Sequence, residues 1–303
     1  MNKRGWLVND CLTCISGTKT LWNDILEWIP GLEDKTRGYT DYSILANIIE
    51  QEAKTNPPDY IIRNGSYFRP LNIPCKTISL IQDIGAPYQI EVGNSSDMVI
   101  YNSNYTYQQY KDKITKPYTI IPIGTDSKVF NVIEDPNPDI LPESILYVGS
   151  SLNHPKGFNH ILDLIHNTNY NFTLIMKDDY KIEHPRVRCF NKLPQDKVAE
   201  IMNCCSLLVC TSVVETQHLS SIEMLFCNRP IITTNIGIYY KDLTIFDSTK
   251  DFGIVGRTES FQDYIRAIKN GKVSYNKCRE WAFENKLDKE SCKQEWIKLI
   301  ESI

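Results

Sequence analysis

The chain has 303 residues, 42% of them hydrophobic, and a formal net charge of −4. This length supports a packed core and roughly two domains, and the mild acidity argues against a surface that coats nucleic acid or an anionic membrane. No apolar run approaches the roughly 20 residues of a membrane span, and the run after the basic N-terminus stops at Asn9-Asp10, too early for a signal peptide. We therefore expect a cytoplasmic protein without a transmembrane segment.

Ten cysteines are present, and Cys11 and Cys14 form a C-x-x-C pair. A zinc site needs four well-placed ligands, but no second C-x-x-C and no suitably spaced histidine pair follows. We expect reduced, mostly buried thiols; a redox role for the pair is the alternative. The abundance of Asn, Lys, Ile and Tyr is similar to that of proteins from AT-rich genomes, including large viruses, for which the location would be the host cytoplasm.

Short apolar runs alternate with longer amphipathic stretches in the first half of the chain. Residues 6–8 are expected to form a strand. The loop 16–18 then leads into a helix whose apolar residues recur at helical spacing until Pro30-Gly31 stops it. Further strands are expected at 60–62, 77–81, 98–101 and 119–122.

A polar, proline-rich segment at 134–139 is typical of a linker, and the same alternation restarts after it. Two blocks of alternating strands and helices predict two parallel α/β domains, at residues 1–133 and 139–280. A helix over 281–303 is expected to follow. Within the second block, strands are expected at 144–149, 172–176, 187–190, 207–210, 231–232 and 243–246, and helices at 158–165 and 198–202.

Two acids, Glu215 and Glu223, flank the start of an apolar helix. Apolar residues recur at helical spacing from Leu219 onward and predict one buried face, so the helix begins near His218 or Leu219. Glu215 then lies in the preceding loop, and Glu223 about one turn inside the helix. A helix N-terminus suits a diphosphate, and an acid on either side of it suits hydroxyl groups, as in a nucleotide sugar. The alternative is an exposed loop acid and a satisfied acid on a half-buried helix.

The stretch 215–223, an E-x7-E motif followed by Pro230 and a strand, resembles the retaining glycosyltransferases of family 4. The resemblance implies an α/β protein with the GT-B fold, in which two Rossmann-like domains face each other across a cleft. The family usually has Phe-Gly at the place of Gln217-His218 and a glycine at the place of Asn228. These differences concern the backbone that approaches the donor sugar.

Two further segments resemble the family in the same order. Residues 121–130 are similar to its interdomain segment IPNGVDxxxF, and residues 145–157 to its segment ILFVGRxxxxKG. In the family, the arginine and the lysine of the second segment hold the diphosphate. Lys156 matches the lysine, whereas Ser150 replaces the arginine. Residues 176–179 stand in place of the family's glycine-rich turn after the next strand.

The resemblance implies a role for each residue of the donor site. Lys156 and the helix N-terminus at 218–220 would stabilise the diphosphate. Glu215 would hold the donor sugar, and Glu223 would hold the ribose. Glu215 and Lys156 are the expected catalytic residues. The expected donor-binding residues are Gly17, Ser150, Lys156, Glu215, His218, Leu219, Ser220 and Glu223.

Gln82-Asp83 stands where many relatives carry His-Asp facing the sugar, so both are expected sugar contacts. The implied reaction moves a hexose from a UDP-sugar, or in second place GDP-mannose, to a glycan, lipid-linked or small-molecule acceptor, with retention of configuration. No metal or other cofactor is implied. The N-terminal domain would shape the acceptor site, and the helix over 281–303 would pack back on that domain.

Other classes fit less well. Asp178-Asp179 could be the metal-binding pair of another transferase fold, but the strand order and the E-x7-E motif argue against it. Residues 16–20 lack the earlier glycine of an NTPase phosphate loop, and no G-x-G-x-x-G follows a strand as in a dinucleotide-binding dehydrogenase. The non-enzyme alternative is an idle nucleotide-sugar-binding module, because several positions, Ser150 among them, depart from the family.

Overall fold

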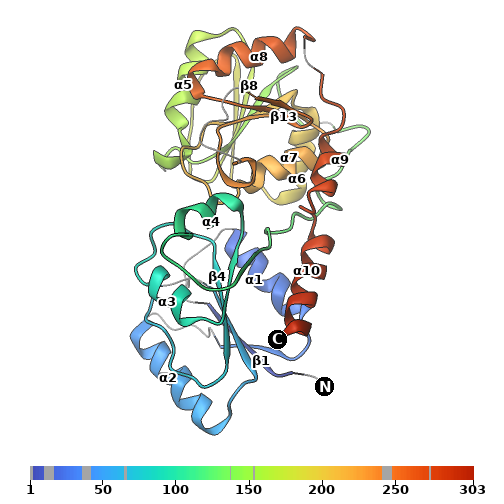
Figure 1. Ribbon diagram of the computed structural model, residues 1–303. Helices are drawn as coiled ribbons and strands as arrows, with labels where there is room; N and C mark the ends of the chain where they lie inside the picture. The colour runs from blue at the N-terminus through green and yellow to red at the C-terminus, as the bar shows by residue number, and fades with distance from the viewer. Residues whose placement is uncertain are drawn as a thin grey trace. The chain divides into compact units, whose positions relative to one another are not determined.

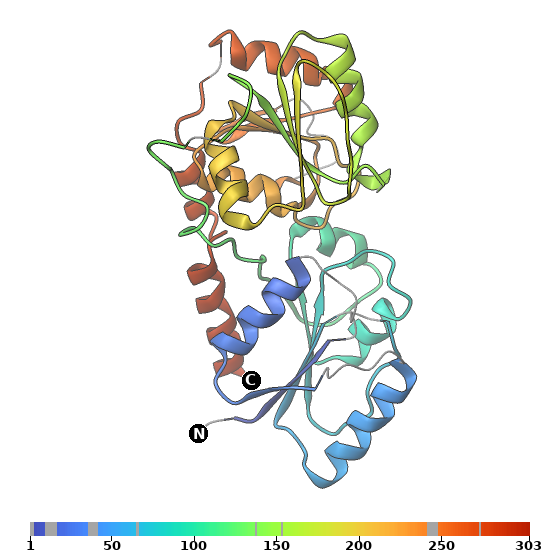
Figure 2. The same ribbon diagram turned by 180° about the vertical axis from the view of Figure 1, so that it is seen from behind.

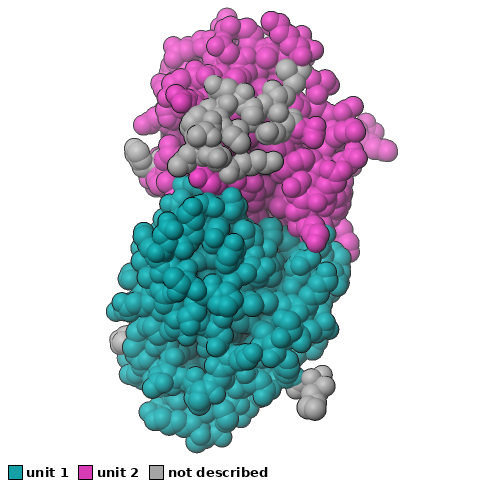
Figure 3. Space-filling view, viewed as in Figure 1, with its two compact units in different colours: residues 1–124, 290–303 teal, residues 125–289 magenta. Residues whose placement is uncertain are grey.

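The computed structural model describes most of the chain (Figures 1 and 2). Its residues fall into two compact units, which Figure 3 colours separately. Unit 1 comprises Met1–Gly124 with Glu290–Ile303, and unit 2 comprises Thr125–Lys289. The described residues are 3–9, 17–35, 42–64, 67–136, 138–152, 154–240, 248–272 and 274–303, so the C-x-x-C pair and the expected strand at 243–246 lie outside them.

Unit 1 has a six-stranded parallel sheet in the order β2-β1-β3-β4-β5-β6. The chain moves outward from β1 to β2, returns to β3 on the other side of β1, and continues outward to β6. The strand order therefore reverses between β1 and β3, as in a doubly wound fold. The strands are β1 (Gly5–Asn9), β2 (Leu32–Asp34), β3 (Tyr60–Asn64), β4 (Lys76–Ile81), β5 (Met98–Tyr101) and β6 (Tyr118–Ile120).

Helices cover both faces of this sheet. Side chains alternate along a strand, so Trp6 and Val8 of β1 point to the same face, where they pack with Leu45 and Ile49 of α2. Figures 1 and 2 both show α1 and α10 on the opposite side of the sheet. The helices of unit 1 are α1 (Gly17–Trp28), α2 (Tyr42–Thr55), α3 (Gln89–Ser95), α4 (Asn104–Tyr110) and α10 (Lys289–Ser302).

Unit 2 has a seven-stranded sheet in the order β12-β13-β11-β10-β7-β8-β9. All pairs are parallel except β12 with β13. The chain runs outward from β7 to β9, then crosses back to β10 on the other side of β7. The strands are β7 (Ile145–Gly149), β8 (Phe172–Met176), β9 (Val187–Asn191), β10 (Leu207–Cys210), β11 (Ile231–Thr233), β12 (Ser248–Lys250) and β13 (Gly253–Val255).

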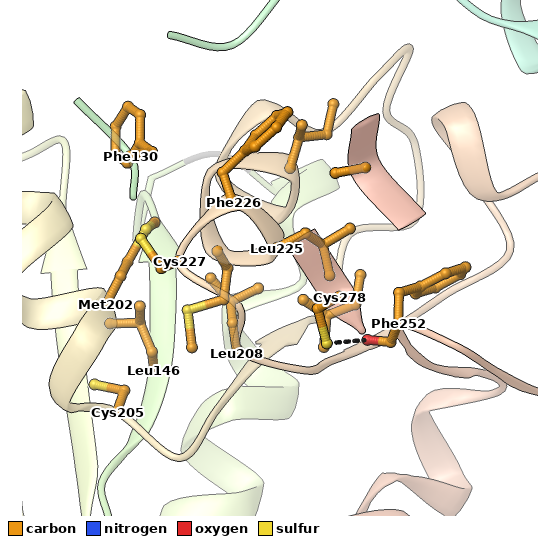
Figure 4. Packing of buried hydrophobic residues seen from close by; sticks show 14 of the residues in the cluster. Phe130, Leu146, Met202, Cys205, Leu208, Leu225, Phe226, Cys227, Phe252 and Cys278 are labelled. Carbon is orange, nitrogen blue, oxygen red and sulfur yellow. Dashed lines mark hydrogen bonds between the residues drawn. The ribbon is translucent and has the colours of Figure 1, made fainter. Parts of the chain in front are cut away.

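Each face of the unit 2 sheet has its own hydrophobic core. One face packs against α5 (Phe158–Asn167) and α8 (Phe261–Lys269). The other packs against α6 (Gln195–Cys204), α7 (Leu219–Phe226) and α9 (Cys278–Glu284). Figure 4 shows this second core, in which side chains of α7 meet strand residues such as Leu208. Short 3-10 helices are η1 (His154–Lys156), η2 (Gly237–Tyr239) and η3 (Thr258–Ser260).

The segment after residue 280 differs from the single helix expected over 281–303. It forms two helices, because the chain breaks at Lys286, whose φ is 54°. The break is held by backbone hydrogen bonds from Thr125 N to Leu287 O at 2.9 Å and from Lys289 N to Thr125 O at 3.0 Å. As a result α9 packs in unit 2, and residues 290–303 belong to unit 1. The division near Thr125 also precedes the linker expected at 134–139.

No helix within the described residues combines the length and the hydropathy that crossing a membrane requires.

Candidate functional site

The candidate site lies at the carboxyl ends of β7 and β10, which are neighbours in the unit 2 sheet. From β7 the chain continues toward one edge of the sheet, and from β10 toward the other. The loops after these two strands therefore part at this point and leave space for a ligand, as in other doubly wound sheets. The β7 loop leads to Lys156, and the β10 loop leads to Glu215.

Gly157 brings Lys156 against the β10 loop. Its φ is 63°, and a Cβ at this position would lie 2.1 Å from the carbonyl oxygen of Thr211. The Thr211 hydroxyl donates to the carbonyl oxygen of Lys156 at 3.0 Å, and Val213 N donates to Pro155 O at 2.8 Å. The backbone at Lys156 is thus held against the β10 loop by contacts that do not involve the Lys156 side chain.

Replacing Gly157 with alanine is expected to destabilise the protein by about 2 kcal/mol or more, because the left-handed backbone and the contact with Thr211 both oppose a Cβ. Gly271 is the matched control: its φ is 67°, but no atom lies within 4 Å of the place that a Cβ would take. Gly271→Ala should cost only the backbone term, about 1 kcal/mol. Urea unfolding of both variants measures the difference, and equal losses would contradict the close approach.

Lys156 and Glu215 form an ion pair across the two loops. The Ser212 hydroxyl also donates to the Glu215 carboxylate, at 3.2 Å. The Glu215 side chain is only 16% exposed. Burial acts to raise the pKa of Glu215, but the neighbouring His218 and Lys156 outweigh it and lower that pKa. Burial also lowers the pKa of His218 to about 4, so His218 is neutral at pH 7 and Lys156 is the cation that balances Glu215 there.

The N-terminus of α7 follows this pair directly. The helix begins at Leu219, as predicted, with His218 as its N-cap. The N–H groups of Leu219 and Ser220 open the helix, where an α-helix offers them no intrahelical acceptor. Behind them, the Ser221 hydroxyl donates to His218 O at 2.7 Å and lies 2.6 Å from the Tyr239 hydroxyl. The start of α7 is therefore fixed from within the core.

Two non-glycine residues keep the left-handed backbone that the family resemblance assigns to glycine. The φ angle is 65° at His218 and 55° at Asn228. Asn228 ends the turn after α7, and its side chain accepts from Arg279 N at 3.2 Å. The departures at these two positions thus change the side chains, while both residues keep a left-handed backbone.

Glu223 sits one turn inside α7 and is half-buried. No described residue donates a hydrogen bond to its carboxylate or pairs with it. Burial raises the pKa of Glu223 to about 7. The two acids of the motif therefore differ: Glu215 is ionised and paired, whereas Glu223 has no partner among the described residues and is close to half-protonated at neutral pH.

The polar residues after β7 and β8 are bonded to one another or to nearby loop residues. Ser150 is half-buried, and its hydroxyl accepts from Leu152 N at 3.2 Å. Asp178 accepts from Ser151 N at 3.0 Å, and Asp179 pairs with Lys192 at 2.6 Å. Asp178 and Asp179 thus bond to different residues. Among the described residues, no group of three or more His, Cys, Asp or Glu side chains could hold a metal ion.

The remaining predicted residues belong to unit 1. Gly17 is the first residue of α1, and the loop before it lies outside the described residues. Gln82 is buried and Asp83 half-buried, immediately after β4. In unit 2 the structure brings together Lys156, Glu215 and His218, and Leu219 and Ser220 follow directly at the start of α7. Ser150 lies after β7 and Glu223 one turn inside α7, and no described contact joins either of them to that group. Sequence reasoning did not identify four residues that hold the site in place, which are Thr211, Ser212, Ser221 and Tyr239. Only their positions could have indicated them: Thr211 and Ser212 directly follow β10, Ser221 lies in α7 and Tyr239 in η2.

No protein-family model matches the chain. A curated protein of Methanocaldococcus jannaschii, the uncharacterized glycosyltransferase MJ1178, is 26% identical over 152 residues, which are 47% of this chain and 41% of that protein. The matched region thus spans less than half of that relative.

Solved structures match almost the whole chain at low sequence identity. Anabaena Alr3699/HepE in complex with UDP and glucose has a TM-score of 0.73 at 14% identity, covering 99% of this chain and 100% of that chain. Sucrose-phosphate synthase from Thermosynechococcus elongatus has a TM-score of 0.78 at 13% identity, and the lipopolysaccharide outer core galactosyltransferase WaaB has 0.76 at 14%; each match covers 99% of both chains. The predicted fold is confirmed: the chain has the GT-B fold of these glycosyltransferases.

Proposed function

We propose that this protein is a retaining glycosyltransferase that moves a hexose from a UDP-sugar to a hydroxyl acceptor. The observation that carries the proposal is the Lys156–Glu215 pair at the point where the strand order reverses, directly before the N-terminus of α7. The curated relative is named a glycosyltransferase, and the structures matched include one with UDP and glucose and one with UDP-glucose. These names favour UDP over GDP as the donor nucleotide.

The chemistry needs a positive environment for the leaving diphosphate. Cleavage of the donor increases negative charge on the diphosphate, and groups already in place stabilise that charge best. Lys156 supplies a cation, and the N–H groups of Leu219 and Ser220 supply hydrogen bonds and the positive end of the α7 dipole. Ser150 supplies no charge in this arrangement, so Lys156 carries more of the stabilisation than it would beside an arginine.

The two glutamates hold the neutral ends of the donor. Glu215 is ionised, and a carboxylate accepts hydrogen bonds from sugar hydroxyls. Glu223 lies farther along α7 and has no partner among the described residues, so its carboxylate is available for the ribose hydroxyls. Neutral His218 lines the same loop without adding charge beside Glu215. No step in this scheme requires a metal ion, and independence of metal remains part of the proposal.

A thermal-shift panel of UDP, GDP, ADP and CDP, with and without EDTA, tests the donor. UDP at 100 times its Kd should raise Tm by roughly 5 °C, in EDTA as well, because it binds only the folded protein. Turnover of UDP-glucose, followed by 1H NMR, would then show whether the product keeps the anomeric configuration. No shift with any nucleotide would contradict a nucleotide-sugar site. A shift without any turnover would favour the idle binding module instead.

A further inference from the structure

Arg279, on α9, binds the C-terminal end of α7. Its Nη1 donates to the carbonyl oxygen of Phe226, the last residue of α7, and to that of Phe130 at 3.0 Å. Its Nη2 donates to Ser127 O at 3.1 Å. The guanidinium carbon lies 5.7 Å from the ring centre of Phe226 and 5.1 Å from that of Phe283. One side chain thus joins α7 to α9 and to the turn that contains Ser127 and Phe130.

Backbone carbonyl groups, and no acidic side chain among the described residues, hold the guanidinium of Arg279. The side chain is half-buried, and burial lowers the pKa of Arg279. A cation removed from water needs hydrogen-bond acceptors. The last carbonyl groups of an α-helix lack an intrahelical donor and carry the negative end of the helix dipole. The contact therefore satisfies both the guanidinium and the open end of α7.

The segments that Arg279 joins to α7 are those through which the chain passes between the units. The chain leaves unit 1 at residues 124–125 and returns to it at 289–290. The turn with Ser127 and Phe130 directly follows the first of these crossings, and α9 ends shortly before the second. Phe130 and Phe226 belong to the same hydrophobic core (Figure 4). Arg279 thus fastens both crossing segments to the helix that carries the donor site.

The helix α7 is short, so its two ends move together. It has eight residues, which span about 12 Å. Its first turn is held by the Ser221 hydroxyl, 2.6 Å from that of Tyr239, and its last residue by Arg279. Glu223 lies between these two fixed points, one turn before Phe226. Burial is the cause of the raised pKa of Glu223, without a contribution from Arg279. Any effect of Arg279 on that carboxylate therefore acts through the position of the helix.

We propose that Arg279 is a positioning residue of the donor site. By holding the C-terminal end of α7, it sets where Glu223 and the N-terminal N–H groups of α7 meet the nucleotide. This inference rests on the proposed function and gives Arg279 no contact with the donor itself. The turn at 127–130 and α9 become part of the support of the site, although both lie far along the chain from the E-x7-E motif.

Hydrogen–deuterium exchange tests the hold on α7 without any ligand. Arg186 is the matched control, because its Nη2 donates to Ile165 O in the last turn of α5 at 3.0 Å, and α5 carries no residue of the donor site. Arg279→Met should speed amide exchange in α7 at least tenfold relative to α5, and Arg186→Met should do the reverse. Because a loss of global stability affects both helices, the ratio of the two rates reports the local contact.

Calorimetric titration of the same variants with UDP measures the consequence for the donor site. Arg279→Met should weaken UDP binding roughly tenfold, and Arg186→Met should change it less than twofold. Arg279→Lys keeps the charge but loses the planar fork that reaches three carbonyl oxygens, so both effects should be intermediate. If Arg279→Met does not fold, Arg279→Lys carries both measurements.

Unchanged exchange in α7, or faster exchange with unchanged affinity for UDP, would overturn the positioning role and leave the proposed donor intact. Full recovery of both quantities by lysine would overturn it too, because charge alone would then suffice. No binding of UDP by the wild type would overturn the proposed function, and the donor role of Arg279 with it.

Discussion

Replacing Lys156 with methionine is expected to lower kcat for sugar transfer by roughly 10²- to 10³-fold, because the leaving diphosphate loses its side-chain cation in a partly buried site. The lysine also neutralises Glu215, which is mostly buried. The same change should therefore destabilise the free protein by about 1–3 kcal/mol, since it leaves an ionised group without its partner. Steady-state kinetics with UDP-glucose and urea unfolding measure the two effects.

A double variant separates these two effects. Lys156→Met combined with Glu215→Gln removes both charges and keeps both shapes, so it should recover most of the lost stability but none of the lost activity. Lys197→Met, on the exposed surface of α6 where Lys197 pairs with Glu200, is the control and should leave kcat within about twofold. Activity that returned together with stability in the double variant would mean that Lys156 acts on the fold and not on the diphosphate.

The strands of this protein could be predicted from the sequence because their apolar runs are short, continuous and separated by helices. Residues 6–8, 60–62, 172–176 and 207–210 all lie in strands of the structure. The helix α2 (Tyr42–Thr55) was not predicted, because its pattern is interrupted by exposed Ile44 and Ile48, which blur the apolar face. The edge strands β2 and β12 are three residues long, too short to give a periodic signal.

The site could be predicted in its residues but not in its interactions. The E-x7-E spacing located Glu215 before α7 and Glu223 inside it, because a helical period fixes where the helix must start. The ion pair of Glu215 with Lys156 joins residues 59 positions apart, and it depends on the crossing of the chain between β9 and β10. The left-handed backbone at His218 was hidden as well, because glycine is the usual sequence signal for that conformation.

Replacing Glu223 with glutamine is expected to weaken UDP binding by roughly 10²-fold at pH 8 and to remove its pH dependence. Two charge-assisted hydrogen bonds from the ribose hydroxyls, each with a net contribution of about 1.5 kcal/mol, account for a loss of that size. In the free protein burial raises the pKa of Glu223 to about 7. Because the ionised carboxylate is the stronger acceptor, UDP should bind the wild type more weakly as the pH falls from 8 to 6 and should displace a proton near pH 7. Calorimetric titration in two buffers of different ionisation enthalpy measures both quantities.

Glu223 should also make the free protein less stable as the pH rises, whereas it makes the affinity for UDP greater. Its pKa is about 4.3 in an unfolded chain and about 7 in the folded protein. Between these values the folded state holds a proton that the unfolded state has lost. The contribution to stability is therefore complete below the unfolded pKa and is lost as the pH rises through 7. Because Glu223 is half-buried, we expect the free protein to lose about 1–3 kcal/mol of stability from pH 5 to pH 8 through this group.

The opposite pH dependences of UDP affinity and of protein stability distinguish a carboxylate that binds the ribose from one that is merely buried. A buried acid without a ligand would give the stability slope alone, and Glu223→Gln would then flatten that slope without changing the affinity for UDP. If Glu223 binds the ribose, both the stability and the affinity for UDP depend on pH, and Glu223→Gln removes both dependences together. Glu200→Gln, on α6 of the same unit, serves as the control that should leave both slopes intact. An affinity for UDP that stayed constant from pH 6 to pH 8 in the wild type would place the ribose away from Glu223, whatever the unfolding curves showed.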